Sequence, residues 1–159
     1  MTERSATHST FAIERHYPAT PARVFAAFSS AEAKLSWIDD PDYVSDGSET
    51  EFDFRVGGRE RFGGKAPDGT PYRYDALYYD IVPDQRIVYC YEMYENSARI
   101  SVSVATIEMV PADGGTRLTY TEQGAFLDGL ARSEDREEGT AEQLDGLLRQ
   151  LRAEAGQTG

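Results

Sequence analysis

Cysteine is almost absent from the sequence. Cys90 is the only one in 159 residues, so the chain cannot form an internal disulfide. It lies in the apolar run 87–91, where a free cysteine usually behaves as a small buried hydrophobe. The N-terminal residues also lack the apolar stretch of a secretory signal. These two absences predict a cytoplasmic location, where thiols stay reduced.

Basic residues and long apolar runs are also scarce. The chain has 16 Lys and Arg against 28 Asp and Glu, a formal net charge of −12. This balance argues against nucleic acids and membrane surfaces as partners, because both are bound through Lys and Arg patches. No apolar run approaches the roughly 18 residues that a membrane span needs. We therefore expect a protein that binds neither nucleic acid nor membrane.

Histidine occurs only twice, as His8 and His16. Neither has a cysteine or carboxylate at metal-ligand spacing, so we expect no metal and no cofactor. His16 is the one ring of the domain body that titrates near neutrality, yet no partner is positioned to make it a general base. The sequence therefore predicts no catalytic residue at either histidine.

What the sequence does contain is an ordinary globular mixture, with 40% hydrophobic and 28% charged residues. Residues 1–9 are polar and are expected to form a disordered leader. Residues 10–155 carry one continuous series of structural patterns, and residues 156–159 form a tail. We expect a single domain with a single core.

The first patterns predict one strand and two short helices. Residues 10–17 alternate between two faces, as in a strand. Thr20 is a good N-cap and Pro21 suits a first helical position. Ser29 and Glu32 have the spacing of a capping box for a second helix that ends near the only tryptophan.

Period-two patterns then predict six more strands, and residues 39–48 between the two regions are expected to form a loop. The strands are expected over residues 49–56, 59–64, 72–82, 85–95, 98–110 and 116–122. Gly57-Gly58 is expected to supply the positive φ angles of a tight hairpin. The connections are short, so consecutive strands must run antiparallel.

Residues 140–155 form the one long amphipathic helix of the sequence, with a start near Ser133 as an alternative. Leu144, Leu147, Leu148 and Leu151 make its apolar stripe. An antiparallel sheet has an apolar face that something must cover, and this helix is the available cover. We expect an α+β helix-grip fold, in which about seven curved antiparallel strands surround the C-terminal helix.

The order of these elements resembles the START-like or Bet v1-like (SRPBCC) superfamily. Within it, the chain looks like the branch named after the C-terminal domain of the activator of Hsp90 ATPase. The matching motifs are ATPARVF (19–25), Trp37, DFRVGGR (53–59), DIVP (80–83), RIVY (86–89), GTRLTYTE (115–122), Glu138-Gly139 and Leu147. Thr140 and Glu122 depart from the usual pattern, in which an aromatic residue and a histidine are common. The resemblance implies the fold and does not imply Hsp90 binding.

In such a fold, alternate strand residues point toward the helix. These residues are aromatic, aliphatic or hydroxyl-bearing, as in a small-molecule site, although the same residues suit a packed core. In strand 72–82 the set Leu77, Tyr79 and Ile81 competes with Tyr74, Ala76 and Tyr78 for the inner face. The predicted cavity residues are Trp37, Phe52, Phe54, Tyr79, Tyr89, Tyr91, Ser103, Ile107, Tyr120, Glu122, Thr140, Leu144 and Leu147.

Three functions remain open from the sequence. The first is a domain that binds a small hydrophobic or aromatic ligand. The second is a cavity enzyme of polyketide cyclase or hydrolase type, with Glu122 and a tyrosine as its acid and base. The third is a protein-interaction module, which includes chaperone regulation and homodimerisation.

Overall fold

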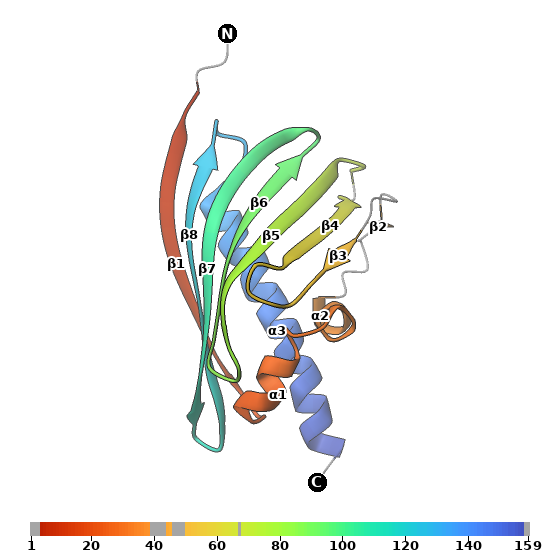
Figure 1. Cartoon of the computed structure of the whole chain (residues 1–159), viewed down its shortest axis with the longest axis vertical. Coiled ribbons are helices and arrows are strands. Elements are labelled where there is room, and N and C mark those ends of the chain that lie inside the picture. Colours follow the sequence, from red (N-terminus) through yellow and green to blue (C-terminus); the bar gives the residue numbers. More distant parts are fainter. Residues whose placement is uncertain (1–3, 39–43, 46–49, 67, 158–159) are drawn as a thin grey trace.

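The computed structural model describes residues 4–38, 44–45, 50–66 and 68–157. They form an eight-stranded antiparallel sheet that curves around one long helix (Figure 1). The elements in chain order are β1 (Ala6–Tyr17), α1 (Pro21–Ala26), α2 (Ala31–Ile38), β2 (Val44–Ser45), β3 (Glu51–Phe52), β4 (Arg59–Lys65), β5 (Pro71–Val82), β6 (Arg86–Glu95), β7 (Ala98–Ala112), β8 (Gly115–Leu127) and α3 (Ser133–Gln157). The expected α+β helix-grip fold is confirmed.

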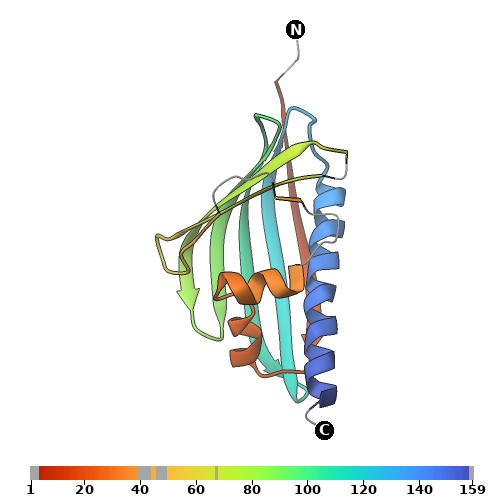
Figure 2. The ribbon, with the colours of Figure 1, turned by 90° about the vertical axis from the view of Figure 1, so that its right-hand side faces the viewer.

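The strand order of the sheet is β1-β8-β7-β6-β5-β4-β2, and β3 pairs with β4. Figure 2 shows α3 running along the concave side of the sheet, with α1 and α2 closing the same side near its lower end. This arrangement buries the inner residues of β6, β7 and β8, which alternate as predicted. Within the described ranges, no helix is both long enough and apolar enough to cross a membrane.

The two ends of the chain are more ordered than the sequence suggested. Strand β1 begins at Ala6 and pairs with β8 as far as Leu127, so residues 6–9 belong to the sheet rather than to a leader. Helix α3 begins at Ser133 and continues to Gln157, so residues 156 and 157 extend it. Pairing along a neighbouring strand supplies the backbone hydrogen bonds that a polar segment lacks on its own.

The short helices follow their capping residues. The Thr20 hydroxyl accepts a hydrogen bond from the backbone N–H of Arg23, and Pro21 takes the first turn, as predicted. For α2 the cap is Ser30 rather than Ser29, because Ser30 Oγ accepts from the N–H of Ala33. The Ser29 hydroxyl instead donates to a carbonyl at the end of α1. The expected capping box is therefore wrong, because the cap lies one residue later and its N3 residue, Ala33, cannot complete a box.

The hairpin before β4 is wider than predicted. Strand β3 ends at Phe52, and residues 53–58 form a turn in which only Gly57 has a positive φ, of 84°. Gly58 is required for another reason, since a Cβ there would lie 2.0 Å from the carbonyl oxygen of Asp53. Val56, which falls within the strand expected over residues 49–56, lies in this turn and is 57% exposed. The expected strand start and most of the expected 39–48 loop lie outside the described residues.

A β-bulge settles the facing of β5. Its register with β6 shifts between Tyr78 and Asp80, which inserts one extra residue and reverses the alternation. Tyr74, Ala76 and Tyr78 therefore face the core, and Ile81 packs against it beyond the bulge. Tyr79 occupies the bulge and is 56% exposed, so its prediction as a cavity residue is wrong.

The outer face of the sheet carries Cys90. It lies between the inward-facing Tyr89 and Tyr91 and pairs with Leu77 and Val104 of the neighbouring strands. Its side chain is half-buried, so the expectation of a small buried hydrophobe holds only in part. Burial nevertheless raises the pKa of the thiol above its ordinary value.

Helix α3 meets the core through the predicted leucine stripe. Leu144, Leu147 and Leu151 are each at most 2% exposed, and the Tyr17 hydroxyl donates to the carbonyl of Leu144 at 2.9 Å. Helix α2 crosses α3 at Gly146, where a Cβ would lie 2.7 Å from the carbonyl oxygen of Trp37. The absence of a side chain at Gly146 thus permits the close contact between the two helices.

Gly146→Ala is expected to cost about 1–3 kcal/mol of overpacking, because the new methyl group forces α2 away from α3. A gain of about 1 kcal/mol in helix propensity offsets part of this cost, so we expect the free energy of unfolding to fall by up to about 2 kcal/mol. Gly156→Ala is the matched control, since a Cβ at that position of α3 meets nothing within 4 Å. Denaturant titration compares the two variants, and equal midpoints would contradict the close contact.

Candidate functional site

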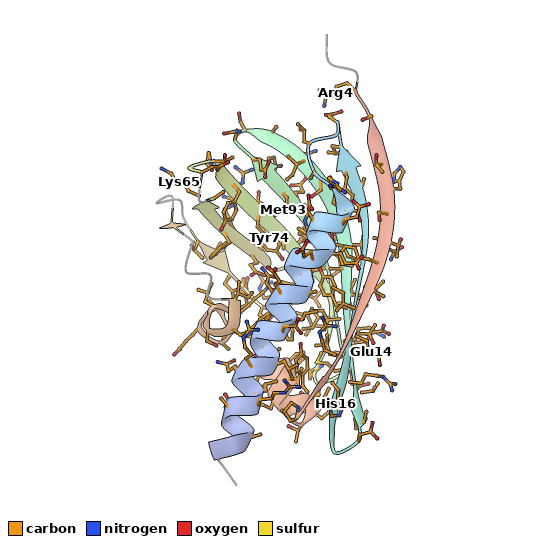
Figure 3. The ribbon with its side chains drawn as sticks, turned by 180° about the vertical axis from the view of Figure 1, so that it is seen from behind. Arg4, Glu14, His16, Lys65, Tyr74 and Met93 are labelled. Atoms are coloured by element: carbon orange, nitrogen blue, oxygen red, sulfur yellow. The ribbon has the colours of Figure 1, made fainter. Side chains whose placement is uncertain are left out.

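A cavity of about 720 Å³ opens between the concave face of the sheet, α2 and α3. This volume falls in the range of small-molecule sites. The cavity is lined by every strand from β3 to β8 and by both of these helices, and its aromatic lining includes Trp37, Phe52, Tyr74, Tyr89, Tyr91 and Tyr120. Figure 3 shows Tyr74 and Met93 beside α3, whereas Glu14 and His16 lie along the edge strand β1.

Tyrosines form the sheet wall of the cavity. The ring centroids of Tyr74 and Tyr91 lie 5.0 Å apart, and those of Tyr89 and Tyr91 lie 6.0 Å apart. Burial is the largest cause that raises the pKa of Tyr74, Tyr89, Tyr91 and Tyr120 above the ordinary tyrosine value. These hydroxyls stay protonated at neutral pH, so the wall offers neutral hydrogen-bonding groups within an aromatic surface.

Behind this wall lies a carboxylate with no solvent exposure, that of Glu122 in β8. Its Oε1 accepts hydrogen bonds from the hydroxyls of Tyr91 and Tyr120, both at 2.7 Å. Its Oε2 accepts from Ser103 Oγ at 2.8 Å and from the Arg136 guanidinium at 3.4 Å. A carboxylate buried in this way is tolerated because four donors, one of them the cationic Arg136, compensate for its lost hydration.

Arg136 connects this cluster to the cavity. It comes from the first turns of α3, lines the cavity, and its side chain is 15% exposed. Its guanidinium also donates to the hydroxyls of Tyr91 at 2.9 Å and Ser101 at 2.8 Å. The rings of Tyr91 and Phe126 lie 5.5 and 5.3 Å from its central carbon, within the range of cation–π attraction. The contacts fix Arg136 between the helix and the sheet.

A second ion pair lies on another wall of the cavity. Lys34 Nζ in α2 lies 2.8 Å from Glu60 Oε2 in β4, and the Tyr78 hydroxyl donates to the same oxygen at 2.8 Å. The side chains of Lys34 and Glu60 are 14% and 10% exposed. The ammonium also lies within 6 Å of the ring centroids of Tyr74 and Tyr89. Both buried cations of the cavity are thus paired with carboxylates.

Residues 18–156 match the family described as activator of Hsp90 ATPase homolog 1-like protein. The chain belongs to this family. The match covers most of the helix-grip domain, and the fold is that of the SRPBCC superfamily.

Solved structures of other members of this fold superpose on the domain over most of its length. The Mll3558 protein from Rhizobium loti is 48% identical, with 92% of this chain and 99% of that chain covered and a TM-score of 0.84. A protein from Rhizobium leguminosarum is 44% identical, with 96% and 99% covered and a TM-score of 0.89. The AHSA1 protein from Silicibacter pomeroyi is 20% identical, with 92% and 99% covered and a TM-score of 0.73, and this likeness concerns the fold alone. No match was found among the curated proteins.

In this activator of Hsp90 ATPase homolog 1-like domain, eight of the predicted residues line the cavity. They are Trp37, Phe52, Tyr89, Tyr91, Ile107, Tyr120, Thr140 and Leu144. Ser103 and Glu122 lie behind the lining and are joined to it by hydrogen bonds. Leu147 is wholly buried in the core, and Phe54 packs against Phe25 and Tyr78 outside the cavity. Tyr79 is exposed at the bulge.

Sequence reasoning missed three charged residues of the domain, namely Lys34, Glu60 and Arg136. Each carried a positional signal. Lys34 precedes Trp37 by three residues, Glu60 precedes the inward Phe62 by two, and Arg136 precedes Thr140 by four. These spacings place the charges on inward faces of α2, β4 and α3. Charge alone suggested solvent exposure, and the pairing that permits burial joins residues far apart in the sequence.

The histidines lie elsewhere in the domain. His16 is exposed, and its Nε2 lies 2.8 Å from the carbonyl oxygen of Ala112. In the part of the chain that the structure describes, no group of three or more histidine, cysteine or acidic side chains is placed to hold a metal ion.

Proposed function

We propose that this domain binds a small, mostly apolar, ring-bearing molecule in the cavity between the sheet, α2 and α3. The supporting observation is an aromatic cavity of about 720 Å³ beside a core whose leucine and tyrosine side chains are nearly inaccessible to solvent. Cores are usually packed to crystal-like density, so an open space of this size calls for an occupant.

The ion pairs of the cavity wall support the same proposal. Replacing a buried ion pair by apolar residues is often neutral or stabilising, so folding stability alone does not account for two such pairs beside one cavity. They fix Arg136 and Lys34 at the surface that an occupant touches. Polar groups fixed in this way within an apolar lining orient a ligand.

Binding fits this site better than acid–base catalysis by Glu122. Its two oxygens already accept four hydrogen bonds, and its side chain has no exposed area. A general base must lie within hydrogen-bond reach of the proton that it removes, and the side chains of Tyr91, Tyr120 and Arg136 stand between Glu122 and the cavity. The carboxylate therefore orients the lining.

Filling the cavity is expected to abolish binding. Gly139 lines the cavity, and a Cβ there meets nothing within 4 Å, so Gly139→Trp adds a large ring at the helix wall. Met93→Trp adds one from the sheet wall. We expect each variant to weaken binding of the uncharged fluorophore N-phenyl-1-naphthylamine by about tenfold or more, measured by its fluorescence on titration.

Gly156→Trp is the control for this experiment, because it places the same ring at an open position on the same helix outside the cavity. It is expected to bind the fluorophore as the unchanged protein does. Absence of saturable binding to the unchanged protein would refute the proposed function, as would full binding by both cavity-filling variants.

A further inference from the structure

We infer that Lys34 binds the ligand of the cavity covalently, through a reversible imine formed with an aldehyde group of that ligand. This inference rests on the proposed binding function and adds a covalent site to it. Two features of Lys34 carry it. Its ammonium group has more donors than acceptors within reach, and a carboxylate that can take its proton lies beside it.

Lysine is a rare residue in this chain. The sequence contains 14 arginines but only two lysines, Lys34 and Lys65. Lys65 is exposed at the end of β4 (Figure 3), whereas the side chain of Lys34 lines the cavity and is 14% exposed. An arginine stays protonated in proteins, whereas a lysine can lose a proton and then attack a carbonyl carbon. The cavity therefore holds the one buried side-chain amine of the described residues.

The contacts of Lys34 leave two of its protons without an oxygen acceptor. An ammonium group has three donors. Among the described residues its only hydrogen-bond acceptor is Glu60 Oε2, at 2.8 Å. Its other neighbours are the rings of Tyr74 and Tyr89, whose centroids lie 5.9 and 5.8 Å from Nζ. A ring face attracts the positive charge but does not replace an oxygen acceptor, and a donor without an acceptor is costly in a desolvated place.

Imine formation removes those two protons as water. Glu60 takes one proton from the ammonium, and the neutral amine attacks the carbonyl carbon of the aldehyde to form a carbinolamine. Glu60 returns the proton to the carbinolamine hydroxyl, which leaves as water while the nitrogen lone pair forms the C=N bond. The product is a protonated imine with one N–H and the same positive charge. The hydrogen bond and the ion pair with Glu60 are therefore kept.

Glu60 is placed to accept and return that proton. A general base must lie within hydrogen-bond reach of the proton that it removes, and Glu60 Oε2 meets this requirement for Lys34. Glu60 lines the cavity as well, and the Tyr78 hydroxyl donates to the same oxygen at 2.8 Å, which fixes its position. The pair of Glu122 and Arg136 differs in this respect, because a guanidinium does not give up its proton.

Reductive trapping of an aromatic aldehyde tests the inference. The full chain is incubated at neutral pH with 2-naphthaldehyde and sodium cyanoborohydride, which reduces imines and leaves aldehydes intact, and peptide mapping by mass spectrometry locates the label. We expect Lys34 to carry at least about tenfold more label than Lys65, the factor that corresponds to relieving one unsatisfied donor. Saturating N-phenyl-1-naphthylamine is expected to block the labelling of Lys34 and to leave that of Lys65 unchanged.

A measurement without reductant uses Lys34→Arg, which keeps a cation beside Glu60 but cannot form an imine. Equilibrium dialysis compares 2-naphthaldehyde with methyl 2-naphthoate, whose ester carbonyl forms no imine. We expect the unchanged protein to prefer the aldehyde by about tenfold and Lys34→Arg to bind the two ligands within about twofold of each other. Lys65→Arg is the matched control and is expected to keep the full preference.

The outcomes separate this inference from the proposed function. If Lys65 is labelled as strongly as Lys34, or if the fluorophore binds and leaves the labelling of Lys34 unchanged, the imine site is wrong and the binding function stands. If Lys34 is not labelled while 2-naphthoate binds with saturation, its free donors serve an anion and the inference is wrong. If neither labelling of Lys34 nor binding of the fluorophore is observed, the proposed function fails together with the inference.

Discussion

Glu122→Gln is expected to lower the free energy of unfolding by about 3–5 kcal/mol, the range measured when one partner of a buried ion pair is removed. The substitution keeps the size of the side chain and changes its chemistry. The carboxylate now accepts from three hydroxyls and the Arg136 guanidinium. The amide nitrogen of a glutamine carries two donors, and it would face neighbouring groups that are themselves donors. The substitution also leaves Arg136 without a carboxylate partner. Urea denaturation at neutral pH measures the loss.

Glu14→Gln is the control, because Glu14 is 64% exposed and lies 3.5 Å from the half-exposed Arg117. Exposed pairs of this kind contribute about 0–1 kcal/mol. The double variant Glu122→Gln/Arg136→Leu is expected to lose less than the sum of the two single variants, since removing both charges leaves neither unpaired. A Glu122→Gln loss equal to that of Glu14→Gln would show that the carboxylate does not hold the wall together.

Most of the fold could be predicted because the inner residues of most strands recur with a period of two. In β6, Ile87, Tyr89 and Tyr91 alternate with more exposed residues and are buried as expected. The period-two pattern fails where a strand contains an extra residue or ends in a turn earlier than predicted. The bulge after Tyr78 reverses the facing of β5, and the wide turn at 53–58 exposes Val56. Neither event has a local hydrophobic signature, because hydrogen bonds to a neighbouring strand determine both.

In the candidate site, the apolar lining could be predicted from the sequence, whereas the ion pairs could not. Aromatic inner residues such as Tyr89, Tyr91 and Tyr120 could be assigned to a cavity wall from alternation alone. Glu122 was recognised as a departure from the family pattern, in which a histidine is common, and was predicted to lie at the cavity. Its partner Arg136 could not be assigned, since the pairing depends on how α3 crosses β8. A charge can be recognised as buried only when its partner is known, and that information is tertiary.

Because several tyrosine hydroxyls are buried, we also expect a large loss of folding stability at alkaline pH. Desolvation is the largest cause that raises the pKa of each of six tyrosines in the folded protein. They are Tyr17, Tyr74, Tyr78, Tyr89, Tyr91 and Tyr120. In the unfolded chain the same groups titrate at the ordinary value of about 10. Above that pH the unfolded state releases protons that the folded state retains.

The sign of the effect follows directly from this difference in bound protons. Stability falls as pH rises wherever the folded state holds more protons, and the stabilisation is complete only below the unfolded pKa. Each raised tyrosine contributes a slope of about 1.4 kcal/mol per pH unit above pH 10, so six together remove about 8 kcal/mol over one unit. Small domains have a total stability of about 5–15 kcal/mol. We therefore expect cooperative unfolding at about pH 11.

Phenolate absorbance and far-ultraviolet circular dichroism, recorded in one alkaline titration, measure this transition. The two signals are expected to change together, because the buried tyrosines ionise only when the chain unfolds. Tyr17→Phe is the informative variant, since it removes one buried hydroxyl that donates to the carbonyl of Leu144, far from the Glu122 cluster. It is expected to make the pH dependence of the unfolding free energy shallower by one proton. Phenolate absorbance that rises fully while the circular dichroism stays constant would mean that the tyrosine wall is open to solvent, and it would remove the basis for treating those hydroxyls as neutral groups in the cavity.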